Sequence, residues 1–297
     1  MNRVYNAALI LLLFSITLIG AKAAKAQDNS VRLLGTCKIP GTATDLSGLE
    51  QQLIPPDGVE IDEIPVPRAF HNNMFGGISA IAWSGTKDVY WLLPDRGPLD
   101  GSVDWTCRVH QVRISIDLKG DRPIEMTILS TALLRDRRGN PYTGIATAFE
   151  ASETHSHRLD PEGIRVAKNG NLYISDEYGP HLIEFTPTGD FVQEFPVPQR
   201  YRVTDLDVFW ATENSKNSAG RCHNRGMEGL AISQNGQQLF GLMQSPLLQD
   251  LENETFDASS QGLNCRLPCF DVQGKCQQEY VYHLEADNLK LNEILSC

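Results

Sequence analysis

The sequence contains few basic residues. It holds 26 Lys and Arg residues against 37 Asp and Glu residues, which gives a net charge of −11 at pH 7. Proteins that bind nucleic acids concentrate Lys and Arg against the phosphate backbone, so this balance argues against a nucleic-acid partner. An acidic surface suits cations such as calcium, which prefers carboxylate and carbonyl oxygens, but the same charge also serves simple solubility.

Long apolar runs are also scarce. The strongest, residues 7–20, is shorter than the about 20 residues that a membrane-spanning helix needs. Arg3 precedes this run, and Ala24-Lys25-Ala26 follows it with small residues at the two positions that a signal peptidase reads. We therefore expect residues 1–26 to be a signal peptide and the mature protein to be secreted or periplasmic, without membrane insertion. An uncleaved N-terminal anchor is the alternative.

Several catalytic signatures are missing. The sequence has no Gly-x-Ser-x-Gly elbow, no phosphate-binding P-loop and no dinucleotide fingerprint. Convincing amphipathic helices are absent after residue 26. These absences argue against an α/β-hydrolase and against a nucleotide-dependent enzyme.

The cysteines are few and odd in number. Seven are present, and Cys265, Cys269 and Cys276 crowd near Pro268 and Gly274 in a spacing that matches no zinc finger or ribbon. An exported chain permits disulfides. We therefore predict a disulfide-stapled surface loop in this stretch, with at least one cysteine of the chain left over.

Three segments of the chain resemble one another. Each has a short apolar strand, a polar turn, a second strand and a polar cluster that ends in proline. The turns Asn169-Gly170 and Asn235-Gly236 are strong hairpin signals because both residues tolerate a positive φ. The first strands of the three copies are residues 79–83, 162–166 and 228–232, and the second strands with their polar clusters are residues 89–98, 172–180 and 239–246.

This repetition predicts an all-β, β-propeller-like fold. Strands at 164–167, 171–175, 181–186 and 190–195 would make one four-stranded blade, and residues 108–134 would supply outer strands of the blade before it. The copies are spaced more widely than the about 40–50 residues of a usual blade, which implies insertions or a degenerate blade. A β-sandwich built from similar hairpins is the rival architecture. Residues 292–295 resemble the start of a further copy, so we expect the chain to be truncated within a repeat.

With these motifs the chain resembles the phytase-like domain family, described as having esterase-like activity of phytase. The resemblance covers about residue 70 to the C-terminus and is carried by residues 76–82, 95–97, 133–136, 160–164, 175–180 and 224–230. It implies a propeller-like fold and a hydrolytic activity. The expected organisation is a signal peptide (1–26), a lead-in segment (27–69) and a C-terminally truncated phytase-like β-propeller domain (70–297).

Acidic residues recur at matching positions of the repeats. Ser79, Glu162, Glu228 and Glu293 begin the first strands, and Asp95, Asp176, Glu177 and Gln244 follow the second strands. First strands of propeller blades line the central channel, so these side chains should converge there. Oxygen ligands without nearby His or Cys suit calcium better than zinc. The predicted metal ligands are Asp95, Glu162, Asp176, Glu177 and Glu228; the alternative is that these acids only cap turns and solvate the blade rim.

Catalytic and substrate-binding roles follow from the same pattern. We predict Glu162, Asp176 and Glu228 as catalytic residues, and Arg96, Tyr178 and Arg225 as substrate-binding residues. Each arginine would serve equally as an ion-pair partner of a nearby acid, and Tyr178 as a packing residue. His155 and His157 are candidates for a general base, with solvated loop histidines as the alternative reading.

The sequence supports two functions of different classes. The first is a metal-assisted hydrolase, acting as a monomer on a small-molecule phosphoester, carboxylic ester or lactone. The second is a non-catalytic propeller that binds a ligand or a partner protein. A truncated chain with an incomplete, inactive site is a third reading.

Overall fold

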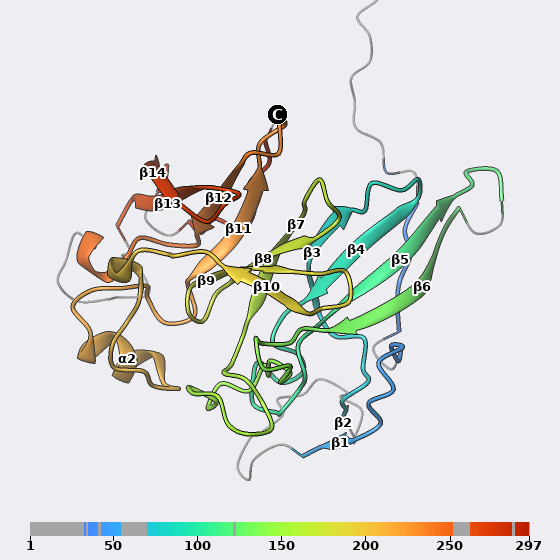
Figure 1. The fold of residues 1–297 in the computed structure, drawn as a ribbon, viewed down its shortest axis with the longest axis horizontal. Helices are drawn as coiled ribbons and strands as arrows, with labels where there is room; N and C mark the ends of the chain where they lie inside the picture. Colours follow the sequence, from blue (N-terminus) through green and yellow to red (C-terminus); the bar gives the residue numbers. More distant parts are fainter. Residues whose placement is uncertain are drawn as a thin grey trace, which may run out of the picture. The chain divides into compact units, whose positions relative to one another are not determined.

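Figure 1 shows the computed structural model of the chain. It describes residues 33, 35–40, 43–54, 70–120, 123–251, 262–286 and 289–296. The predicted signal peptide and residues 55–69 of the predicted lead-in segment lie outside these residues. The chain divides into the units Met1–Thr36 and Cys37–Cys297, and all strands described below belong to the second unit. In the described part of the chain, no helix has the length and apolar character needed to cross a membrane.

The described residues form three four-stranded antiparallel sheets and one two-stranded sheet, β1 (Gln52–Leu53) with β2 (Phe70–His71). In each larger sheet the strands are hydrogen-bonded in chain order (Figure 1). The first sheet contains β3 (Ile78–Trp83), β4 (Val89–Pro94), β5 (Arg108–Ile116) and β6 (Ile124–Leu133). The second contains β7 (Pro161–Val166), β8 (Leu172–Asp176), β9 (His181–Phe185) and β10 (Phe191–Glu194). The third contains β11 (Met227–Ile232), β12 (Gln238–Met243), β13 (Asn264–Asp271) and β14 (Cys276–His283).

The helical elements of the described residues are short. They are the 3₁₀ turns η1 (Gln199–Tyr201) and η2 (Leu248–Asp250) and the α-helix α2 (Trp210–Lys216). All three lie in the connections around the third sheet, before β11 or between β12 and β13. The absence of longer helices from the described residues agrees with the all-β prediction.

The three larger sheets are the blades that the repeats predicted. The first strands of consecutive sheets lie next to one another, β3 against β7 and β7 against β11. This arrangement confirms the propeller-like prediction, and successive meanders do not form the two facing layers of the rival sandwich. The strands of the second sheet match their predicted ranges within three residues, and residues 108–134 supply β5 and β6 as expected.

The repeated Glu-Gly pairs have a packing reason. A Cβ atom on Gly163 would lie 2.5 Å from Ser175 Oγ and 2.8 Å from Leu230 Cβ. Only glycine therefore allows β7 to approach β11 so closely. Gly229 is in a similar position, because a Cβ there would lie 3.2 Å from the backbone nitrogen of Ile294.

Apolar side chains fill the spaces between neighbouring blades. One cluster joins Trp91 and Leu93 of the first blade to Ile164 and Phe185 of the second. Another joins Tyr173 of the second blade to Leu230 and Leu239 of the third. Each fully buried large side chain contributes about 1.5–3 kcal/mol to folding, so these clusters hold the first strands, and the residues at their ends, in fixed positions.

The predicted disulfide loop is wrong. Cys265 and Cys269 lie on β13 and Cys276 begins β14, so the stretch is a hairpin of two paired strands. The two cysteines of β13 are four residues apart, which places them on one face of the strand, and both are buried. None of the described cysteines forms a disulfide, and Cys297 lies outside the described residues. Burial accounts for these two cysteines as well as a disulfide would, since free cysteine is among the most buried residue types.

Candidate functional site

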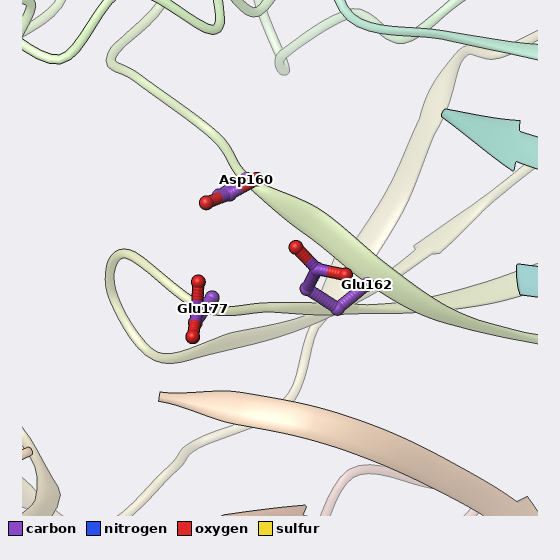
Figure 2. Close-up of side chains that lie close together, drawn as sticks. All are labelled: Asp160, Glu162 and Glu177. Atoms are coloured by element: carbon purple, nitrogen blue, oxygen red, sulfur yellow. The ribbon is translucent and has the colours of Figure 1, made fainter. Parts of the chain in front are cut away.

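Three carboxylates converge where the second blade begins. Asp160 directly precedes β7, Glu162 lies on β7, and Glu177 directly follows β8. Each offers an oxygen, and these three oxygens all lie within 4.8 Å of one another. Figure 2 shows the three side chains directed toward a common space. We call Asp160, Glu162 and Glu177 the acidic cluster.

Strand pairing explains this convergence. Pro161 pairs with Asp176 at the ends of β7 and β8, which places the residues flanking the pair side by side. The backbone N–H of Glu177 then donates to the carbonyl oxygen of Asp160 at 2.9 Å. Asp160 and Glu162 are two residues apart, a spacing that directs side chains to the same face of an extended segment.

Burial makes the acidic cluster hard to ionise. It raises the pKa of Glu162 to about 10, with the charges of Asp160 and Glu228 as further causes. Burial also raises the pKa of Asp160 to about 7, although Arg96 acts in the opposite direction. The pKa of Glu177 lies well above its usual range for the same reason, since burial removes water from the carboxylate and neighbouring acids repel its charge.

Arg96 is the cation that touches the acidic cluster. Its Nη1 lies 2.5 Å from Asp160 Oδ2, and its backbone N–H donates to Asp160 Oδ1 at 3.1 Å. The same guanidinium also donates to Asn224 and forms an ion pair with Asp100. Arg96 thus joins the loop after β4 to the start of β7 and to the segment before β11. Both roles considered for it are compatible with this position, because it is an ion-pair partner and also lines a pocket.

The acidic cluster fits a divalent cation. When ionised, the three carboxylates repel one another, and the charge of Arg96 offsets only part of theirs, so a divalent cation would relieve the remaining repulsion. Glu177 is 3% exposed, and its Oε1 has no hydrogen-bond partner among the described residues. A buried polar atom without a partner is costly, so it marks a place where a ligand would bind. Donors that are all oxygen match calcium or magnesium rather than zinc.

The other predicted acids lie around this cluster. Glu228, on β11, accepts from Gln244 Nε2 at 2.8 Å and from Asn292 Nδ2 at 3.3 Å, and burial raises its pKa. Asp95 accepts from the backbone N–H of Gly97 at 2.7 Å. Neither belongs to the group of three converging oxygens. Their predicted roles as metal ligands, and the catalytic role of Glu228, remain predictions.

Asp176 has a different position from the one expected for a ligand. Its carboxylate accepts backbone N–H groups from Asp160 at 2.8 Å, Tyr178 at 3.2 Å and Gly179 at 2.6 Å. These bonds hold the turn that carries Glu177. The geometry gives Asp176 a part in positioning the acidic cluster, and its predicted catalytic role stays a prediction.

The predicted substrate-binding residues share a pocket. Arg96, Tyr178 and Arg225 line a cavity of about 390 Å³, together with His223 and Asn224. The Tyr178 ring lies between two guanidinium groups, that of Arg96 at 5.4 Å and that of Arg158 at 4.4 Å from its centroid, and its hydroxyl donates to Gly144 O at 3.4 Å. The packing role considered for Tyr178 therefore accounts for most of its contacts.

Sequence reasoning missed two parts of the site. Asp160 belongs to the motif at residues 160–164, and its spacing of two residues from Glu162 is a signal that could have placed it in the site. Asn224 was also missed, because nothing in the sequence links it to Arg96. His157, considered as a general base, packs against the rings of Tyr142 and His181, and burial lowers its pKa to about 4.

Comparison with known proteins found related chains and similar folds. An uncharacterized secreted protein of Arthroderma benhamiae is 27% identical, over 59% of this chain and 45% of its own length. The chain therefore spans less than half the length of this curated relative. The Dos1 propeller is 13% identical over 75% of this chain and 40% of its own, with a TM-score of 0.36. Pseudomonas aeruginosa periplasmic gluconolactonase is 11% identical over 74% of this chain and 60% of its own, with a TM-score of 0.33.

The family match covers most of the described chain. The model of the phytase-like family, described as esterase-like activity of phytase, matches residues 73–297. This range contains all three blades and the acidic cluster. The chain therefore belongs to the phytase-like family.

Proposed function

We propose that this protein is an exported, metal-assisted hydrolase of a small phosphoester, carboxylic ester or lactone. The observation that carries the proposal is the acidic cluster beside a pocket lined by arginines. In the part of the chain that the structure describes, the buried Oε1 of Glu177 has no hydrogen-bond partner. The family match supports hydrolysis. The predicted signal peptide and the secreted relative support export.

The proposed roles follow the geometry. Asp160, Glu162 and Glu177 would hold a divalent cation, with calcium the best match to their oxygens. When bound, such a cation would polarise the scissile group and lower the pKa of a water molecule. Arg96 and Arg225 would bind the phosphoryl or carboxyl oxygens of the substrate, since a guanidinium offers two parallel donors to such groups. Glu228 and Asp95 would add negative charge at the rim of the site.

Hydrolysis assays with a matched pair of variants test this proposal. The protein would be assayed on p-nitrophenyl phosphate, p-nitrophenyl acetate, phytate and a lactone, each with calcium and with EDTA. We expect calcium-dependent turnover that Glu162→Gln abolishes, because the variant loses a ligand. Glu153→Gln is the control, since Glu153 is exposed on the loop before Asp160 and should leave the rate unchanged.

The outcomes separate the two functions that the sequence left open. No turnover on any of the four substrates, together with a calcium-dependent rise in melting temperature, would replace the hydrolase with a ligand-binding propeller. Turnover that is equal in wild type and Glu162→Gln would contradict the assigned site. Turnover that survives EDTA would remove the metal from the proposal.

A further inference from the structure

A histidine and a glutamate form a pair on the wall of the same pocket. Glu213 lies on α2, and its Oε1 is 2.9 Å from Nδ1 of His223. The backbone N–H of His223 donates to Asn214 Oδ1 at 2.8 Å, which fixes the residue at a second point. His223 lines the pocket that Arg96, Tyr178 and Arg225 also line. Neither His223 nor Glu213 has a role in the proposed metal chemistry.

The surroundings of Glu213 keep it ionised. The residue is fully buried, and its carboxylate lies 2.5 Å from Arg221 Nη1 and 3.7 Å from Arg158 Nη2. It also accepts the backbone N–H of Asp207 at 3.0 Å. Burial opposes ionisation, but the hydrogen bond with His223 and the charge of Arg221 outweigh it, and the pKa of Glu213 falls to about 2.

An ionised carboxylate fixes the tautomer of its histidine partner. A carboxylate only accepts hydrogen bonds, so Nδ1 of His223 must carry the proton that it donates to Glu213. The other ring nitrogen, Nε2, then carries a lone pair in neutral imidazole. Among the described residues, no hydrogen-bond partner is found for Nε2. The arrangement of carboxylate, histidine and free acceptor nitrogen is the one that activates a nucleophile in hydrolases.

The pocket connects this pair to the acidic cluster. Arg96 lines the pocket, and its Nη1 lies 2.5 Å from Asp160 Oδ2. The same nitrogen donates to Asn224, the residue next to His223. One side chain therefore touches both the acidic cluster and the segment that carries the histidine. A substrate bound against Arg96 would lie within reach of both.

We propose that His223 is the proton-transfer residue of the hydrolase, and that Glu213 positions it. This inference rests on the proposed function. The oxygen of a water molecule would bond to the phosphorus or carbonyl carbon of the ester while one water proton passes to His223 Nε2. The bond from the phosphorus or carbonyl carbon to the leaving oxygen would then break, and its electron pair would stay on the leaving oxygen. The leaving oxygen would take the proton from Nε2, so that water and ester give acid and alcohol and His223 ends neutral.

Two substitutions of His223 separate this role from a structural one. In His223→Asn the amide nitrogen takes the place of Nδ1, so the variant keeps a donor to Glu213 and loses Nε2. In His223→Gln the amide nitrogen takes the place of Nε2 instead, so the contact with Glu213 is lost. A structural histidine would tolerate the first change better than the second. A proton-transfer residue would lose its activity in both.

The experiment measures kcat/KM and melting temperature for wild type, His223→Asn, His223→Gln and a control, His283→Asn. His283 is exposed at the end of β14, where its Nδ1 lies 2.9 Å from Asn264 Oδ1. We expect His223→Asn to lose at least about 100-fold in kcat/KM, the usual range for removing a general base, with a melting temperature close to that of wild type. The loss should be larger for an alkyl ester than for a p-nitrophenyl ester, because a poor leaving group needs the returned proton more. Added imidazole should restore part of the rate.

Each result decides between the alternatives. An active wild type whose His223→Asn variant keeps its rate would overturn the role of His223 and leave the proposed function intact. If His223→Asn lost kcat/KM by the same factor for both esters, and imidazole did not restore the rate, the role of His223 would also be overturned. A wild type without turnover on any ester would overturn the proposed function and this inference together.

Discussion

The metal-free protein should lose stability as the pH rises above neutrality. Glu162 carries the effect, because its pKa is about 10 in the folded chain and 4.5 in its ordinary state. Between these two values the folded protein holds a proton that the unfolded protein has released. The unfolded state is therefore favoured increasingly as the pH rises, and the free energy of unfolding falls.

The contribution of Glu162 is that of one proton, and Glu177, whose pKa is also raised by burial, adds to it in the same direction. A difference of one proton changes the free energy of unfolding by about 1.4 kcal/mol per pH unit. From pH 7 to pH 8.5 this amounts to a loss of about 2 kcal/mol, or about 4–8 °C in melting temperature for a chain of this size class. Neither His110 nor His157 masks the effect, since burial lowers the pKa of each to about 4, below this pH range.

Thermal unfolding in EDTA and reductant measures this slope. Circular dichroism at pH 7, 7.5, 8 and 8.5 would be recorded for wild type and Glu162→Gln. We expect a falling melting temperature in wild type and a flatter profile in the variant, whose neutral amide mimics the protonated acid. Calcium should flatten the wild-type profile, because a cation stabilises the ionised carboxylates. Equal slopes in the two proteins, or stability that rises with pH, would refute the reasoning about Glu162.

Three further predictions concern other parts of the structure. Glu177→Gln should weaken calcium binding by at least about tenfold, since it replaces the carboxylate whose Oε1 has no hydrogen-bond partner among the residues that the structure describes. Isothermal titration calorimetry measures this affinity, and an unchanged value would exclude Glu177 as a ligand. Glu213→Gln should lower the free energy of unfolding by about 3–5 kcal/mol, because it leaves the buried Arg221 guanidinium without its counter-charge. Urea unfolding measures this, and a decrease below about 1 kcal/mol would mean that the ion pair contributes little to stability. Gly163→Ala should lower the free energy of unfolding by about 1–3 kcal/mol, since its Cβ would lie 2.5 Å from Ser175 Oγ. Gly170→Ala is the control for steric crowding. A Cβ at residue 170 meets no atom within 4 Å, and only the positive φ of this residue opposes the change.

The blades were predictable because their signals are local. Asn169-Gly170 and Asn235-Gly236 mark hairpins within a few residues, and the apolar alternation on either side fixes the strands. Glu162 and Glu177 were predictable as members of one site because the repeats align them with strand ends. The prediction of a disulfide loop was wrong because cysteine spacing alone does not distinguish a cysteine-rich loop from a hairpin with buried cysteines.

The long-range parts of the site gave no sequence signal. Arg96 and Asn224 each belong to a motif of the sequence, but they are 128 positions apart, and no spacing pairs them with one another. Glu213 and His223 come from a short helix and a loop, where no periodicity points to the pocket. Contacts of this kind depend on how blades and connections pack against one another, and a single sequence does not specify them by pattern.

Arg96 has a consequence for how the chain folds. Its partners Asp160 and Asn224 lie 64 and 128 positions further along the chain. In most repeat proteins each unit contacts only its neighbours, so that units can unfold one at a time. Here a single guanidinium ties the first blade to the beginnings of the second and the third, and unfolding of either removes one of the partners of this buried charge. We therefore expect the blades to unfold as one cooperative unit, and Arg96 to form its bonds late in folding, because contacts so distant in sequence are slow to form.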